Sequence, residues 1–238
     1  MAPHSSALKH TLEELLRHRR LQAEAPPLRG QDRRLLPLPT GVNVVDEPLG
    51  GGLPRGQVSE VHGPPSAGRT ALVLSLAARV TRSGALAGWI DPRDRFDPAT
   101  AASAGTDLAR LLWLRGRAGS GRILSESAAA TGTLVGAGLF DLVVLDLAGI
   151  PVPEIQRLPG ATWIRLQRMI EATPTALVLV ADGHVAHGPG GVSLALAPGS
   201  ARWSGPAGPG RLLRGLVTEV RAGGHVLRPV AFERVAGI

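Results

Sequence analysis

A run of eight residues carries the clearest chemical signal in the sequence. It consists of Gly63, Pro64, Pro65, Ser66, Ala67, Gly68, Arg69 and Thr70. Its glycines and final hydroxyl match the loop pattern in which backbone N–H groups wrap phosphates, a lysine reaches the outer phosphates and the hydroxyl binds Mg²⁺. Arg69 stands in the lysine position, and its planar guanidinium is not equivalent to an ammonium at a packed phosphate site. We therefore expect the shape of a phosphate-binding loop with, at most, weak binding of ATP and Mg²⁺.

A carboxylate suited to the same chemistry ends a nearly continuous apolar run. Residues 140–146 read Phe-Asp-Leu-Val-Val-Leu-Asp, which is typical of a strand buried on both faces of a parallel sheet. Asp146 at its end is placed to help hold Mg²⁺ beside the loop. A lone aspartate at a strand end can also simply cap the next turn. Its combination with the phosphate loop favours the metal role.

A general base is harder to find. Asp91, Asp94 and Asp97 follow another apolar segment, but Arg93 and Arg95 alternate with them. We expect these guanidinium groups to hold the carboxylates as ion pairs, which leaves none poised to activate a water molecule. No catalytic residue is predicted.

The elements around these residues alternate between strand and helix. Strands are predicted at residues 57–62, 85–91, 140–146 and 175–181, and helices at 70–81 and 162–172. This alternation predicts an α/β fold with a mainly parallel sheet flanked by helices. Residues 212–221 and 225–235 are expected to form a C-terminal antiparallel hairpin. Residues 183–210, rich in Gly, Pro and Ser, are expected to form a long loop.

The N-terminal part differs from the rest of the chain. Residues 5–22 carry a leucine stripe at helical spacing, with glutamates early and arginines late. The stripe consists of Leu8, Leu12, Leu15 and Leu16. Because a Pro-rich linker follows, we divide the chain into an N-terminal helix with its linker (1–37) and a core domain (38–238). The leucines are candidate partner-binding residues, or the helix folds back onto its own domain.

Composition excludes several classes of protein. The 238 residues are 44% hydrophobic, which is enough to bury a core. The absence of cysteine excludes disulfides, thiolate catalysis and cysteine-bound metals. With no apolar run near the ~20 residues of a membrane span and no signal peptide, we expect a cytoplasmic protein with no membrane partner. The net charge of +7 fits a nucleic-acid partner and equally fits a biased genomic base composition.

Several motifs together resemble the RecA recombinase core. The segment Gly-Gly-Gly-Leu-Pro-Arg-Gly-Gln-Val (50–58) leads into the phosphate loop, and Trp-Ile-Asp (89–91) and Phe-Asp-Pro (96–98) follow it. The resemblance runs from about residue 38 to the final hairpin. Within this superfamily the chain is most similar to the ImuA family, RecA-like accessory proteins of bacterial damage-inducible translesion synthesis.

Carried onto this sequence, the resemblance implies a nucleotide-binding loop at 63–70 and a Walker B aspartate at Asp146. The recombinase's catalytic glutamate falls on Arg93, its adenine-stacking tyrosine on Thr100, and its polar switch residue near Asp182. Arginine cannot act as a base and threonine cannot stack on adenine. Together with the arginine in the loop, these replacements imply that nucleotide turnover is lost.

The resemblance also indicates where DNA would be contacted. The DNA loops of the recombinase fall near 151–160 and 183–210, and the second is nearly uncharged here. Because phosphate contacts supply most non-specific affinity, we expect weak DNA binding. The candidate DNA-binding residues are Arg157, Arg165, Arg168 and Arg202. Solvated surface arginines are the alternative, and Trp163 and Trp203 can stack on bases or pack inside the protein.

Two histidines, His184 and His187, lie three residues apart near Asp182. A protein metal site needs more ligands than this pair supplies, and the sequence shows no third clear ligand. No metal site is predicted.

Three functions follow from these observations. The first is a non-catalytic accessory protein of the SOS response and error-prone translesion synthesis, for which the resemblance implies RecA itself and an inactive polymerase relative of the ImuB type as partners. The second is a DNA-dependent ATPase or recombinase, which Arg69, Arg93 and Thr100 oppose. The third is a nucleotide sensor that binds without hydrolysis.

Overall fold

The computed structural model describes residues 14, 36–116, 121–171, 173–185, 190–206 and 208–233. The leucine stripe of the predicted N-terminal helix (Leu8, Leu12, Leu15 and Leu16) lies outside these residues, as does His187. In the described part of the chain, no helix is long and apolar enough to cross a membrane.

A single nine-stranded sheet organises the described residues, in the order β3-β2-β4-β5-β1-β6-β7-β8, with β9 also paired to β7. The strands are β1 (Val58–His62), β2 (Leu86–Asp91), β3 (Leu111–Arg115), β4 (Phe140–Asp146), β5 (Ala176–Ala181), β6 (Ser193–Ser204), β7 (Leu212–Ala222), β8 (His225–Val226) and β9 (Val230–Glu233). Neighbours from β3 through β6 are parallel, whereas β7 is antiparallel to β6, β8 and β9. The predicted α/β class, mainly parallel sheet and antiparallel C-terminal strands are confirmed.

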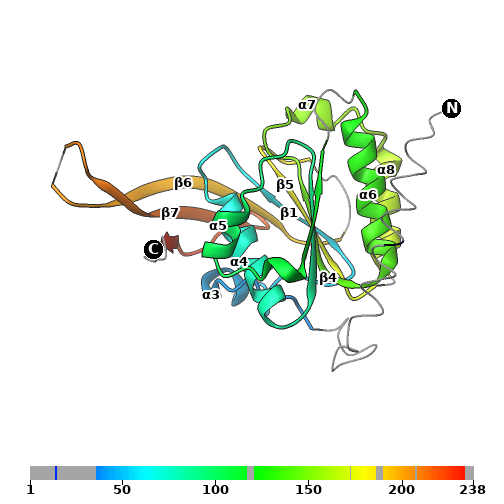
Figure 1. Cartoon of the computed structure of the whole chain (residues 1–238), viewed down its shortest axis with the longest axis horizontal. Coiled ribbons are helices and arrows are strands. Elements are labelled where there is room, and N and C mark those ends of the chain that lie inside the picture. The colour runs from blue at the N-terminus through cyan, green and yellow to red at the C-terminus, as the bar shows by residue number, and fades with distance from the viewer. Residues whose placement is uncertain are drawn as a thin grey trace.

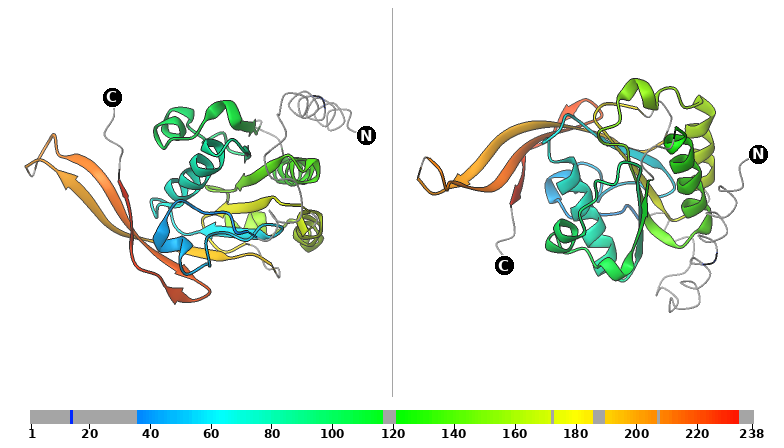
Figure 2. Two further views of the ribbon diagram at one scale, coloured as in Figure 1. Left: turned by 90° about the horizontal axis from the view of Figure 1, so that it is seen from below. Right: turned by 45° about the horizontal axis from the view of Figure 1, so that its top comes forward.

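Helices cover both faces of the parallel strands (Figure 1). The helical segments are α3 (Asn43–Asp46), α4 (Arg69–Arg82), α5 (Pro98–Ser103), η1 (Leu108–Arg110), α6 (Ile123–Ala137), α7 (Val152–Ile155) and α8 (Gly160–Glu171). Helices α4 and α5 lie on one face and α6 and α8 on the other, as the views of Figure 2 also show. The flanking helices predicted from the sequence are therefore present.

The alternation of side chains along β4 explains why both faces need a helical cover. Leu142 and Val144 pack with α4 in one buried cluster, whereas Val143 and Leu145 pack with α6 and α8 in another. Because successive strand residues point to opposite faces, an uninterrupted apolar strand can be buried only between two layers.

Two helices show how the sequence meets this need. In α4, Leu72, Leu76 and Val80 are buried at intervals of four residues, which places them on one helix face toward the sheet. In α8, Leu166 and Ile170 follow the same spacing and close the opposite face.

The prediction of one long loop at residues 183–210 is wrong over much of its length, because β6 occupies Ser193–Ser204. At its start Leu194 and Leu196 are buried and alternate with alanines, and this part pairs with β1. The outer part is exposed and carries Pro198, Gly199 and Ser200, which hid the strand from sequence reasoning.

The predicted C-terminal hairpin is present but shorter than expected. β7 and β8 join through Gly223 and Gly224, which both adopt positive φ. The chain then forms a separate strand, β9, along β7, and the longest partner of β7 is β6.

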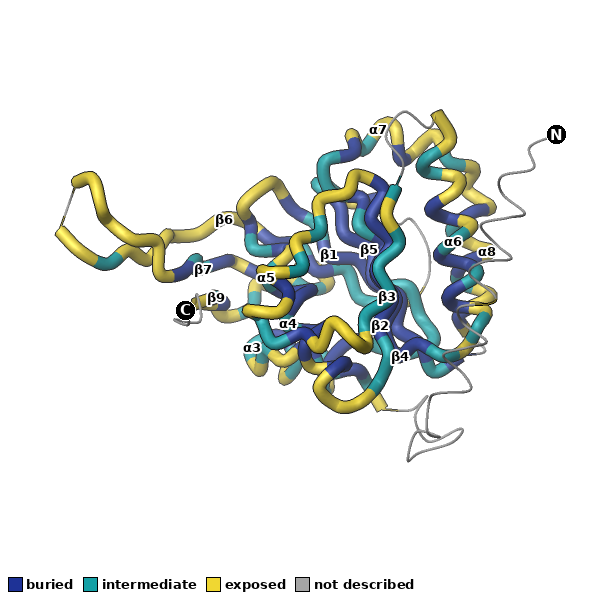
Figure 3. Tube along the Cα trace, viewed as in Figure 1, coloured by how far each residue is buried: buried dark blue, intermediate teal, exposed yellow. Residues whose placement is uncertain are grey.

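β6 and β7 extend beyond the helical layers as a two-stranded ribbon (Figure 1). The ribbon is buried at its base and exposed over its outer half (Figure 3). Its base lies beside the loop that follows β1, which brings the C-terminal strands to the predicted phosphate site.

Candidate functional site

The loop 63–70 leaves β1 at its carboxyl end and leads directly into α4. Gly63 has φ 152° and its N–H donates to the Ala181 carbonyl oxygen at 3.3 Å. A Cβ added to Gly63 would collide with the carbonyl oxygen of Leu196 in β6. This glycine is required because the ribbon base runs directly against the loop.

Gly68, the second motif glycine, has φ 88° and is the residue before the first turn of α4. A Cβ here would lie 2.6 Å from Thr218 Oγ1 of β7 and 3.1 Å from the Phe232 ring of β9. Both the left-handed backbone and the close approach of these strands therefore demand glycine.

The outer side of the loop is open. Pro64, Pro65, Ser66 and Thr70 are exposed, and the Ala67 N–H folds back to the Pro64 carbonyl at 3.2 Å. The loop ends at the N-terminus of a 14-residue helix, where backbone N–H groups and the helix dipole favour negative charge. The backbone can thus accept an anion.

Arg69 points away from this open side. Its side chain is 9% exposed, and Nη1 donates to Asp182 Oδ1 at 2.5 Å, just beyond β5. The Gly149 N–H donates to the same carboxylate at 3.2 Å. In a phosphate-binding loop the cation at this position contacts the phosphates, whereas here the Arg69 guanidinium binds a carboxylate of its own chain.

Asp146, at the end of β4, is a partly buried carboxyl in the same region. Burial raises its pKa from 3.8 to about 6, and the nearby Asp91 charge adds to the rise. The Ala148 N–H, which donates to Oδ1 at 3.1 Å, and the charges of Arg69 and Arg95 lower the pKa in part. The hydrogen bond from the Ala148 N–H shows that Asp146 caps the turn after β4, which was the alternative role considered for it.

The three aspartates after β2 have structural partners. Asp91 accepts from the Phe96 N–H at 2.8 Å and from Trp113 Nε1 at 3.3 Å. Asp94 is bound by both Nε and Nη2 of Arg115, whose hydrogen bond lowers the pKa of Asp94. Asp97 caps α5, and a hydrogen bond from the Thr100 hydroxyl lowers its pKa.

The expected ion pairs of these aspartates with Arg93 and Arg95 are thus wrong in their partners. The Arg93 guanidinium donates to the Gly149 carbonyl at 3.3 Å, and that of Arg95 lies against Gly149. Arg115 was missed because it belongs to β3, a strand that sequence reasoning did not find. Parallel pairing of β2 with β3 brings it opposite Asp91.

The family model for the RecA N-terminal domain matches residues 28–171, more than half of the chain. The chain belongs to the RecA family. It is similar to Protein RecA of Paenarthrobacter aurescens (38% identity over 133 residues, 55% of this chain and 37% of that protein). Similarity to Protein RecA of Acidothermus cellulolyticus is 33% over 167 residues, 68% of this chain and 46% of that protein. The matches span less than half the length of these relatives.

In this RecA-family chain the candidate DNA-binding arginines do not form one surface. Arg157 follows α7, Arg165 and Arg168 are exposed on α8, and Arg202 lies on the ribbon. Helix α8 and the ribbon lie at opposite ends of the molecule (Figure 1). Arg202 donates to Glu233 Oε1 at 2.8 Å, which neutralises it locally.

The two tryptophans named with these arginines have different surroundings. Trp163 packs against the buried cluster under α6 and α8. Trp203 is 47% exposed near the outer end of β6, and the Arg211 guanidinium lies 5.7 Å from its ring centroid. Arg211, just before β7, was not among the candidates, because no local pattern in the sequence indicates that it lies near Trp203.

A second cluster of polar side chains lies at the carboxyl end of β1. Glu60 Oε2 and His184 Nδ1 are 2.5 Å apart, and the rings of His62 and His184 are 5.5 Å apart between centroids. Burial is the main cause that lowers the pKa of His62, and the charge of Glu60 opposes it.

His184 belongs to this cluster and Asp182 does not, whereas His187 lies outside the described residues. Asp182 is bound to Arg69, whereas His184 meets Glu60 and His62 of β1. The sequence signal that could have identified Glu60 and His62 is their i, i+2 spacing, which places both residues on one face of a strand.

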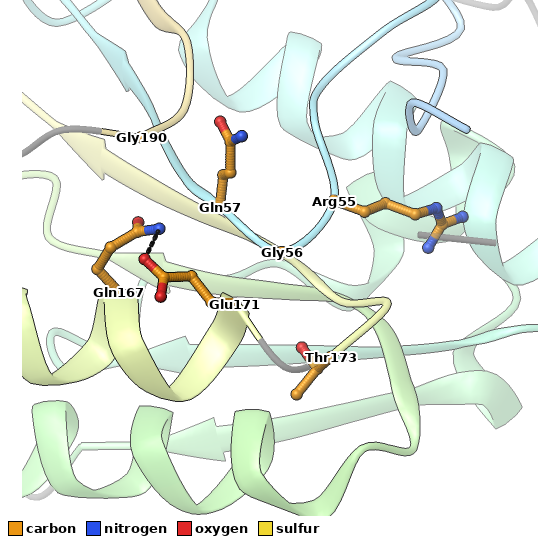
Figure 4. A pocket seen from close by; sticks show the side chains of 7 residues that line it. All are labelled: Arg55, Gly56, Gln57, Gln167, Glu171, Thr173 and Gly190. Carbon is orange, nitrogen blue, oxygen red and sulfur yellow. Dashed lines mark hydrogen bonds between the residues drawn. The ribbon is translucent and has the colours of Figure 1, made fainter. Parts of the chain in front are cut away.

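An open cavity of about 420 Å³ lies near the amino ends of β1 and β5 (Figure 4). Its lining residues are Arg55, Gly56, Gln57, Gln167, Glu171, Thr173 and Gly190. Gln167 is bound to Glu171 and to the Val58 N–H, and Arg55 pairs with Asp141 at 3.0 Å. Because the phosphate loop follows the carboxyl end of β1, this cavity is not part of that site.

Proposed function

We propose that this chain is a non-catalytic RecA-like accessory protein that acts in the SOS response and error-prone translesion DNA synthesis. It would work by binding RecA, a polymerase partner of the ImuB type, or both, and by modulating them in the cytoplasm. The observation that carries the non-catalytic part of the proposal is the ion pair between Arg69 and Asp182, which engages the loop cation with a carboxylate of the same chain.

Releasing Arg69 toward a nucleotide would break this pair. Removing one partner of a buried ion pair costs about 3–5 kcal/mol, because the other charge is left uncompensated. Asp182 is 30% exposed and keeps the Gly149 N–H, so we take about 2–3 kcal/mol here. At 1.4 kcal/mol per tenfold change, that lowers affinity for a triphosphate by roughly 30- to 150-fold.

The residues around the loop support the loss of turnover. They fit an anion held by exposed backbone, but they do not fit a hydrolytic ATP–Mg²⁺ centre. A pKa of about 6 still leaves Asp146 mostly ionised at pH 7, the form a Mg²⁺ ligand must take, so this carboxylate is not the missing element. Arg93, which donates to Gly149, occupies the position of the catalytic glutamate in the resemblance and cannot accept a proton from water.

ATP hydrolysis measured with and without single-stranded DNA tests this proposal. The wild-type chain and Asp146→Asn are expected to give the same background rate, with no stimulation by DNA. Stimulated hydrolysis that Asp146→Asn abolishes would overturn the proposal and favour a DNA-dependent ATPase or recombinase.

Partner binding needs its own experiment. Purified full-length chain is expected to retain RecA or the ImuB-type polymerase relative in a pull-down, and removal of residues 1–30 to weaken that retention. If neither protein is retained, the accessory role is wrong even when hydrolysis is absent.

The open side of the loop favours one second candidate, a nucleotide sensor that binds without hydrolysis. Calorimetric titration with ATP distinguishes it: measurable binding that is lost in Gly68→Asp supports a sensor. Circular dichroism of the variant checks its fold, because Gly68 is closely packed. Titration with single-stranded DNA at two salt concentrations tests the weak DNA binding that the dispersed arginines support.

A further inference from the structure

The cluster at the end of β1 contains three side chains that can each offer a metal ligand. Glu60, His62 and His184 have ligand atoms that all lie within 4.8 Å of one another. Glu60 and His62 come from one face of β1, and His184 comes from the segment that follows β5. These two strands are parallel neighbours, with His62 opposite Ala181 in the register, so residues 182–185 continue over the end of β1.

The carboxylate of this cluster is held in position before any ion arrives. Glu60 is 2% exposed, and the Val185 N–H donates to Oε1 at 2.6 Å. The other oxygen, Oε2, faces His184 Nδ1 at 2.5 Å. Hydrogen bonds of this kind orient metal-binding groups in known sites, and here the bond comes from the backbone of a neighbouring segment.

The chemistry of the three groups selects among metals. Two imidazole nitrogens and one carboxylate oxygen suit Zn²⁺, whereas Mg²⁺ and Ca²⁺ take oxygen ligands throughout. Zn²⁺ bonds of about 2.0–2.1 Å in a tetrahedron place ligand atoms roughly 3.3 Å apart. The observed limit of 4.8 Å and the 2.5 Å contact between Glu60 and His184 bracket this spacing. Side-chain rotations that change these separations by up to about 1.5 Å would bring the three ligand atoms to this spacing.

We propose that Glu60, His62 and His184 form a Zn²⁺ site at the carboxyl end of β1. The His184 side chain is 46% exposed, so the fourth coordination position is open to water and the ion can enter from solvent. The ion would join the end of β1 to the segment after β5. That segment also supplies Asp182 to Arg69, and Gly63 of the phosphate loop directly follows His62.

The test uses the full chain, freed of metal with a chelator, and titrates ZnCl₂ in competition with a chromophoric chelator. One equivalent of Zn²⁺ is expected to bind, and excess Mg²⁺ is not expected to displace it. His62→Asn, His184→Asn and Glu60→Gln should each weaken binding at least ~10-fold, because loss of a group that merely supports a ligand already costs about 10- to 100-fold. Glu60→Gln keeps an oxygen for the Val185 N–H, so its fold is expected to survive.

His225→Asn is the matched control, because His225 is an exposed histidine on β8 that contributes no ligand to the cluster. It should bind Zn²⁺ like the wild type. As a second measurement, Zn²⁺ should raise the melting temperature of the wild type and of His225→Asn, but not of His184→Asn. No binding by the wild type, or binding by His62→Asn and His184→Asn as tight as that of the wild type, would overturn the site and leave the cluster as a hydrogen-bonded Glu–His pair.

Discussion

Asp146→Asn is expected to affect the stability of the fold more favourably at pH 8 than at pH 5. In the folded chain burial raises the pKa of Asp146 from 3.8 to about 6. An acid whose pKa is raised by folding contributes most favourably below pH 3.8, and that contribution is lost as the pH rises through about 6. At 1.36 kcal/mol per pH unit, the interval of about 2.2 units costs the wild type about 3 kcal/mol above pH 7.

The same relation gives a cost of about 1.6 kcal/mol at pH 5, because most of the folded population is then protonated at Asp146. Asparagine does not titrate and keeps an oxygen for the Ala148 N–H. Its amide N–H groups bring a burial cost of about 1–3 kcal/mol of their own, which is the same at both pH values. The testable quantity is therefore the change in unfolding free energy caused by the substitution at pH 8 minus the same change at pH 5. This difference should be about 1.4 kcal/mol in favour of the variant at the higher pH.

Urea unfolding followed by circular dichroism measures this difference. The wild type and Asp146→Asn are compared at pH 8 and pH 5 in matched ionic strength. Subtracting the wild-type values removes the titrating groups that do not interact with Asp146. An equal gain at both pH values, or a larger gain at pH 5, would refute the claim that burial of this carboxyl sets its pKa.

Three further substitutions test the packing around the loop and one exposed ion pair on the ribbon. Arg69→Met is expected to destabilise the fold by about 2–3 kcal/mol, and a double-mutant cycle with Asp182→Asn in urea unfolding should give about 1–3 kcal/mol of coupling; additive effects would show that the pair does not form. Gly68→Ala should lower the unfolding free energy by about 1 kcal/mol more than Gly84→Ala, since both glycines have positive φ but only Gly68 is in contact with Thr218 and Phe232. Equal losses would contradict the close approach of the ribbon base. Arg202→Ala should change stability by less than about 0.5 kcal/mol, because its pair with Glu233 is exposed; a loss above 1 kcal/mol would give that pair a structural role.

The parallel strands were predictable because a strand buried on both faces has a nearly continuous apolar sequence. β4 and β5 are almost entirely apolar, and α4 and α8 carry buried residues at helical spacing. Helix α6 lacks such a pattern. The buried face of α6 includes Ser127, Thr131 and Gly132, so no continuous apolar stripe distinguishes this helix in the sequence. β3, at the edge of the sheet, was missed; it is only half-buried and so lacks the burial on both faces that distinguishes β4 and β5.

For the candidate site, the sequence predicted the position of the loop but not the fate of its charged groups. Arg69 and Asp182 are 113 residues apart, and only the adjacency of β1 and β5 in the sheet brings them together. Glu60 and His184 are separated by 124 residues and meet for the same reason. Local motifs give residue types and spacing along one segment, whereas such pairs depend on strand order.

The exposure gradient along the ribbon has a consequence for hydrogen exchange. Near the base, Leu196, Thr218 and Val220 are buried, so their amides should open to solvent only with the unfolding of the whole sheet. Farther out, Leu212 and Leu213 are about half exposed, and little apolar burial opposes a local separation of the two strands. Deuterium should therefore enter the outer ribbon long before it reaches the strands that hold the phosphate loop.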